Sequence, residues 1–98
     1  MIAKHTKSSG NIFADLGATP DEAKNLLLRA QLMIEVELYV EREGLTQVVA
    51  AKRLGITQSR LSELKNGRID LFTIDKLVTM LERAGVEVSL KVKQHKAA

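Results

Sequence analysis

The 98-residue chain contains no cysteine and no tryptophan, and its aromatic residues are one tyrosine and two phenylalanines. Without cysteine the chain forms neither disulfides nor thiolate metal sites, and a reducing cytoplasm is permitted. Because aromatic side chains are so scarce, leucine, isoleucine, valine and alanine must build any core. This composition favours helices over a β-sandwich.

Several functional signals are also missing. No apolar run is long enough to span a bilayer, and residues 1–10 lack the apolar stretch of a signal peptide. Neither a phosphate-binding glycine loop nor a Gly-x-Ser-x-Gly element occurs. The two histidines, His5 and His95, have no acidic or cysteine neighbour at ligand spacing. We therefore expect a cytoplasmic, non-enzymatic protein without metal, cofactor or membrane contact.

The most informative stretch, residues 45–67, carries two short helical patterns that each open on Thr-Gln. We expect helices at residues 47–54 and 58 to about 65, capped by Thr46 and Thr57, with Gly55 in the tight turn between them. This is the layout of a helix-turn-helix, whose second helix enters the DNA major groove. The pattern predicts sequence-specific binding to double-stranded operator DNA.

Charge is unevenly distributed, although the net charge is only +3. Residues 35–43 hold four acids against one base, whereas residues 52–68 hold five bases against one acid: Lys52, Arg53, Arg60, Lys65 and Arg68 against Glu63. The basic side coincides with the helix-turn-helix, which favours contact with a phosphate backbone. The alternative is two ordinary solvated helix faces.

The outward-facing polar residues of the motif are the candidate DNA contacts. Glutamine pairs with adenine and arginine with guanine, so the start of the second helix is expected to read bases, through Gln58, Ser59, Arg60 and Ser62. Phosphate contacts are expected from Gln47, Lys65, Asn66 and Arg68. We also expect Gln47 to brace Gln58. The single acid, Glu63, either accepts a hydrogen bond from cytosine or forms an ion pair with a lysine or arginine of the protein. We favour the ion pair.

The whole chain divides into four parts, and the motif lies within the second. Residues 1–18 are expected to form a flexible arm with a short apolar patch, 19–85 a helical domain, 86–93 a strand, and 94–98 a tail. Thr19-Pro20-Asp21-Glu22 starts a helical pattern that runs to Glu43, as one helix or two. Apolar residues cover most of its circumference, so we infer that part of this surface meets another chain.

The spacing of apolar residues changes at Gly85, from a helical period before it to strict alternation after it. A fourth helical pattern, from Thr73 or Asp75, uses Ile74, Leu77, Val78 and Leu81 as its buried face. Apolar residues then alternate with polar ones, at Val86, Val88, Leu90 and Val92, which is typical of a half-buried strand. A lone strand needs a partner, so we expect it to pair with its own copy in a homodimer. The alternative is pairing within the chain, near Ile12 and Phe13.

The motif resembles the Cro/repressor-type (XRE) helix-turn-helix family, which includes the lambda repressor. The resemblance covers roughly residues 33–84 and rests on Leu-Thr-Gln, Ala-Ala-Lys-Arg-Leu-Gly-Ile, Gln-Ser and Leu-Lys-Asn-Gly. It implies an all-α, lambda-repressor-like bundle of about five helices, here with a C-terminal strand pairing across a dimer. It also implies phosphate contact by Gln47 and base reading by Gln58 and Ser59. Val49 departs from the polar residue common at its position.

The flanking residues are similar to those of antitoxins related to HigA. The similarity rests on residues 11–17, Asn-Ile-Phe-Ala-Asp-Leu-Gly, followed by a Leu-Leu-Leu-Arg-Ala helix. Such proteins repress their own operon and neutralise a RelE-like ribonuclease toxin. The resemblance implies toxin contact through Ile12, Phe13 and Leu16, unless these three pack on the protein's own core. The other readings are a standalone or phage-type regulator, or a protein-interaction module with the motif as scaffold.

Overall fold

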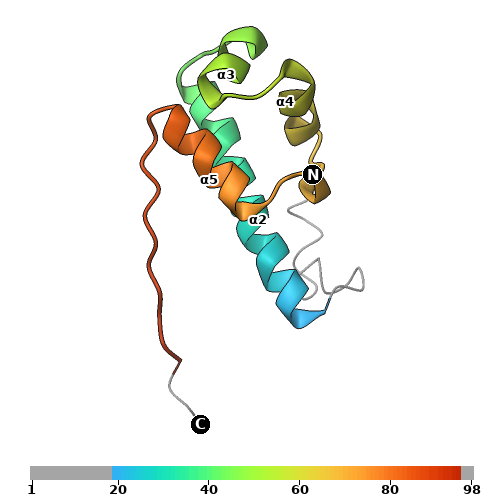
Figure 1. Cartoon of the computed structure of the whole chain (residues 1–98), viewed down its shortest axis with the longest axis vertical. Coiled ribbons are helices and arrows are strands. Elements are labelled where there is room, and N and C mark those ends of the chain that lie inside the picture. Colours follow the sequence, from blue (N-terminus) through green and yellow to red (C-terminus); the bar gives the residue numbers. More distant parts are fainter. Residues whose placement is uncertain (1–18, 96–98) are drawn as a thin grey trace.

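A computed structural model describes residues 19–95 of the chain (Figure 1). This part is helical, with α2 at Pro20–Arg42, α3 at Gln47–Leu54, α4 at Gln58–Lys65 and α5 at Ile74–Arg83. A short 3-10 helix, η2 at Ile69–Leu71, lies between α4 and α5. The expectation of about five helices is therefore corrected, for the described residues, to four α-helices and one 3-10 turn.

The long segment before the motif is a single helix. Thr19 and Glu22 form the expected capping box, in which the Thr19 amide donates to Glu22 Oε1 at 2.9 Å and the Glu22 amide donates to Thr19 Oγ1 at 3.2 Å. No glycine or further proline interrupts the helix before Gly44, which has φ 62°. Among residues 19–95, no helix combines the length and the apolarity needed to cross a membrane.

The helix-turn-helix forms as the sequence indicated. The Thr46 hydroxyl accepts from the amide of Val49 at 3.3 Å, and the Thr57 hydroxyl accepts from the amide of Arg60 at 3.0 Å. Gly55 adopts φ 75°, which a residue with a Cβ rarely does. A Cβ there would also lie 2.5 Å from Nη1 of Arg83, so the exposed Arg83 side chain would have to move as well.

One core joins all the helices, and Phe72 is among its largest fully buried side chains. The others are Leu54, Leu61, Leu64, Leu77, Leu81 and Val36. On α5 the buried face is Leu77, Met80 and Leu81, while the expected Ile74 and Val78 are only half-buried. Residues 68–72 read as a loop from sequence, yet η2 turns Phe72 inward and so connects α4 to α5.

The strand expected at residues 86–93 is absent from the described chain. The segment leaves α5 as a single extended ribbon with no second backbone beside it (Figure 1). Val86 and Val88 pack against the core, whereas Leu90 and Val92 are 88% and 80% exposed. The Val88 amide donates to Glu82 Oε2 at 3.1 Å rather than to another strand. Alternation thus produced an extended conformation, but a ladder requires a partner backbone that residues 19–95 do not offer, and the alternative partner near Ile12 and Phe13 lies outside the described residues.

Candidate functional site

Helix α4 is anchored on one side and free on the other. Leu61 and Leu64 are fully buried, and Gln58 and Ser59 at its start are exposed. At 100° per residue, the direction opposite the buried leucines falls between Ser59 and Asn66. The helix therefore presents a polar face to solvent along its whole length.

The glutamines that open the two helices are in contact. Nε2 of Gln47 donates to the carbonyl oxygen of Gln58 at 3.3 Å. This bond links the first turn of α3 to the first turn of α4, because each glutamine follows its threonine cap directly. The expected brace is present, and it leaves the side chain of Gln58 free to contact a ligand.

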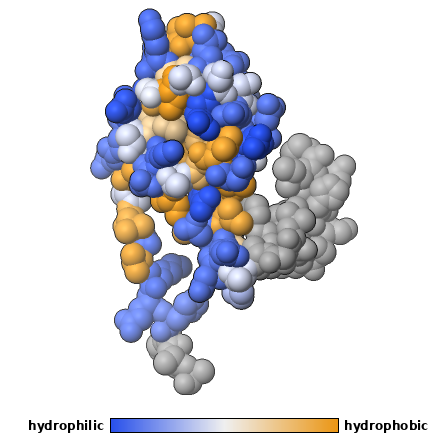
Figure 2. Space-filling model, turned by 45° about the vertical axis from the view of Figure 1, so that its right-hand side comes forward, coloured by the Kyte–Doolittle hydropathy of each residue, from blue (hydrophilic) through white to orange (hydrophobic). Residues whose placement is uncertain are grey.

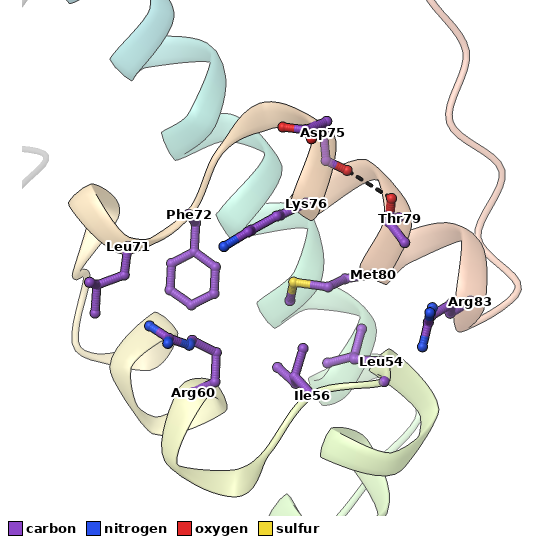
Figure 3. A pocket seen from close by; sticks show the side chains of 11 residues that line it. Leu54, Ile56, Arg60, Leu71, Phe72, Asp75, Lys76, Thr79, Met80 and Arg83 are labelled. Carbon is purple, nitrogen blue, oxygen red and sulfur yellow. Dashed lines mark hydrogen bonds between the residues drawn. The ribbon is translucent and has the colours of Figure 1, made fainter.

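Arg60 lies on the flank of α4, where two groups hold its guanidinium. Nη1 of Arg60 lies 3.0 Å from Oε1 of Glu63, and the guanidinium carbon lies 6.0 Å from the centroid of the Phe72 ring. Glu63 thus forms an ion pair with a basic side chain, Arg60, which is the alternative favoured from sequence. Figure 3 shows the Arg60 side chain directed toward Phe72. Reading a base from this position requires Arg60 to leave both partners.

The two cations near the C-terminus of α4, Lys65 and Arg68, differ in whether a carboxylate binds them. Lys65 and Asn66 are exposed, as is Arg68. Arg68 donates through Nε and Nη2 to the two carboxylate oxygens of Asp70, both at 3.3 Å. This hydrogen bonding lowers the pKa of Asp70 below its usual value and raises the pKa of Arg68. A phosphate would compete with Asp70 for Arg68 but would meet no such competitor at Lys65 among the described ion pairs.

A shallow pocket beside α4 was not foreseen from sequence. It has a volume of about 310 Å³ and lies between the α3–α4 turn, η2 and α5 (Figure 3). Leu54, Ile56 and Phe72 give it an apolar wall, and Arg60 reaches it from α4. The apolar residues Ile69, Leu71 and Phe72 are the sequence signal that this segment carries buried side chains.

Other expected site residues are not brought together. Ser62 is half-buried on α4, between the exposed Ser59 and Asn66. In the part of the chain that the structure describes, Val86 to Val92 contact no second strand. The proposed toxin contacts Ile12, Phe13 and Leu16 lie outside that part. Within residues 19–95, no cluster of three histidine, aspartate or glutamate side chains has the arrangement of a metal site.

Comparison with known proteins agrees with this geometry. A family described as a helix-turn-helix domain matches residues 12–93, which is most of the chain. A solved structure of an XRE-family transcriptional regulator superposes with a TM-score of 0.72 at 28% sequence identity, covering 79% of this chain and 90% of that chain. No curated protein sequence matches.

Proposed function

The chain belongs to the helix-turn-helix domain family, and from that membership we propose that it is a sequence-specific DNA-binding transcriptional regulator. The single observation that carries the proposal is the exposed start of α4, where Gln58 and Ser59 face solvent while Gln47 holds the helix in place. The similarity to an XRE-family regulator supports the same conclusion.

Binding proceeds through two kinds of contact. Helix α4 lies in the major groove, where Gln58 pairs with the N6 and N7 positions of adenine and Ser59 and Ser62 contact neighbouring base edges. Gln47, Lys65, Asn66 and Arg68 bind phosphates on either side and set the orientation of the helix. Arg60 contributes to base reading when DNA replaces Glu63 as its partner. The role is binding without catalysis, and its place is the cytoplasm, where the operator is.

The regulator acts as a repressor and as a homodimer. Two copies related by a two-fold axis read a pseudo-palindrome, with half-sites about one helical turn apart. Pairing of residues 86–93 between copies would give the exposed Leu90 and Val92 a neighbour and would complete the backbone hydrogen bonds of the extended segment.

We further propose that the protein is the antitoxin of a toxin–antitoxin operon. The support is the resemblance of residues 11–17 and the following helix to HigA-related antitoxins. In this role the protein represses its own operon and neutralises a RelE-like ribonuclease, which it contacts through Ile12, Phe13 and Leu16. A ribonuclease-like reading frame next to this gene would support the role, and its absence would favour a standalone or phage-type regulator.

The deciding experiment is fluorescence anisotropy with duplex DNA from the protein's own promoter and a scrambled duplex of equal length. We expect tight binding to the promoter and a Kd that is at least about a thousandfold weaker for the scrambled duplex. Gln94→Ala, an exposed glutamine beyond the motif, serves as the matched control for Gln58→Ala. Salt-sensitive binding with equal affinity for both duplexes would instead indicate an interaction module that uses the motif as scaffold.

A further inference from the structure

Helix α2 carries a second apolar stripe on the side away from the core. Its core face consists of Met33, Val36, Tyr39 and Val40. On the opposite side, Leu27, Ile34 and Leu38 are 38%, 55% and 45% exposed. Apolar side chains are visible at the surface of the helical body in Figure 2. Such a two-sided helix has one face that the described residues, 19–95, leave uncovered.

The exposed stripe has the spacing of a helix–helix interface. Its members follow one another in alternating steps of three and four residues, and all are exposed: Lys24, Leu27, Gln31, Ile34, Leu38 and Glu41. This is the a/d pattern with which one helix packs along another. The stripe is about 26 Å long at 1.5 Å per residue.

The order of residues along the stripe selects the partner. When the stripe lies antiparallel to a second copy of itself, Leu27 faces Leu38, Gln31 faces Ile34, and Lys24 faces Glu41. Each pair occurs twice, as a two-fold axis requires. Gln31 and Ile34 therefore meet at the centre of the contact, the Leu27–Leu38 pairs lie on either side of them, and opposite charges occupy the ends.

The parallel arrangement has the reverse electrostatics. It sets Lys24 against Lys24 at one end of the contact and Glu41 against Glu41 at the other. Like charges in register destabilise a helix pair, so the charge pattern favours the antiparallel contact. We propose that α2 is an antiparallel self-association surface, on which two copies of this chain pair through Leu27, Ile34 and Leu38.

This contact is independent of the proposed DNA binding and of strand pairing, because it uses a different element. Cysteine crosslinking tests the register directly, since the native chain has no cysteine. The double variant Leu27→Cys/Leu38→Cys is expected to form a covalent dimer on mild oxidation. Each single variant should stay unlinked, because equivalent positions lie about 16 Å apart along the antiparallel pair, beyond disulfide reach. Self-linking of each single variant would establish a parallel contact and overturn the proposal.

Sedimentation equilibrium of the full chain supplies the energetic test. Ile34→Glu should weaken self-association at least about tenfold. Because Ile34 is exposed, helicity by circular dichroism should stay unchanged, and the effect is then not one of unfolding. The same comparison in a Leu90→Pro background separates the α2 contact from strand pairing. An unchanged association constant for Ile34→Glu in both backgrounds would overturn the proposal.

Charge reversal at both ends of the contact should restore self-association, a result that a general loss of stability would not produce. Lys24→Glu and Glu41→Lys should each weaken self-association. The double variant should restore it, because positions 24 and 41 then again carry opposite charges, with the signs exchanged. Lys52→Glu, an exposed charge reversal on α3, is the control and should have no effect. Failure of the double variant to recover would refute the antiparallel register. If Ile34→Glu abolishes binding to a different protein while self-association is unchanged, the stripe has another partner and the proposal is wrong.

Discussion

The side-chain amide of Gln47 donates to the main-chain carbonyl of Gln58 at 3.3 Å. The two helices of the motif are thus joined through a side chain that also lies at the front of α3. A substitution at Gln47 therefore affects both the position of α4 and the proposed contact with phosphate, whereas a substitution at Gln58 removes a side chain without removing the brace.

Gln58→Ala should relax sequence preference. The amide of Gln58 is proposed to read a base edge, so its loss should cost about 1–3 kcal/mol on the preferred operator and much less on scrambled DNA. Competition anisotropy with both duplexes measures the difference. A uniform loss over all sequences would show that Gln58 does not read bases.

Gln47→Ala should weaken binding to every duplex. It removes one hydrogen bond to phosphate and the brace to Gln58, which together are worth about 1–2 kcal/mol. The ratio of operator to scrambled affinity should change less than for Gln58→Ala. Urea unfolding of the same variant shows whether the fold is retained, and a selective loss on the operator alone would contradict the phosphate assignment.

Lys65→Ala should reduce the salt dependence of DNA binding more than Arg68→Ala does. Each phosphate contact by a free cation contributes about 0.9 to the slope of log K against log salt. Arg68 is already paired with Asp70, so DNA must displace a carboxylate at this position. Kd values over a range of NaCl concentrations give the slopes. Equal slope changes for the two variants would show that the pairing with Asp70 does not persist in solution.

Glu63→Gln should strengthen binding to all DNA. It removes a negative charge from a surface proposed to face phosphates, and it releases Arg60 from the 3.0 Å ion pair. We expect a tighter Kd and a steeper salt dependence for scrambled DNA as well as operator. Glu87→Gln, an exposed acid beyond α5, is the control for a change in net charge alone. Weaker operator binding by Glu63→Gln would indicate that Glu63 accepts from a base.

Gly55→Ala should destabilise the fold more than Gly44→Ala. Both glycines have positive φ, at 75° and 62°, and a Cβ in that region costs about 1–2 kcal/mol. Only at Gly55 would the new Cβ also meet Arg83, while nothing lies within 4 Å at Gly44. Urea unfolding of both variants isolates the steric part. Adding Arg83→Ala to Gly55→Ala should recover that part and leave the backbone cost.

Acid should weaken the fold through three carboxyl groups. Hydrogen bonds from Thr19, Arg68 and Thr73 lower the pKa of Glu22, Asp70 and Asp75 respectively. A carboxyl with a lower pKa in the folded state adds stability above its ordinary pKa and loses it as the pH falls through the folded value. The free energy of unfolding should therefore decline as the pH falls below the ordinary values, 4.5 for glutamate and 3.8 for aspartate. Glu22→Gln, which removes the titrating group, should make this decline shallower.

Helix caps and turn glycines act through the backbone of a few adjacent residues, so their positions could be predicted from the sequence. Threonine at position 46 or 57 caps a helix wherever the helix lies, and Gly55 permits a turn because of its own φ. The face of α4 followed from helical period once Leu61 and Leu64 were taken as buried. The helix-turn-helix and its exposed polar residues were therefore legible in the sequence by itself.

Contacts between distant segments were decided only by the tertiary structure. The loop before α5 placed Phe72 in the core, and there it meets the Arg60 guanidinium that sequence reasoning had directed at DNA. Arg83 covers Gly55 because α5 packs beside the turn. Residues 86–93 had the alternation of a strand, but alternation specifies only an extended backbone. Hydrogen bonding in a strand depends on a second backbone, and no pattern within one segment supplies it.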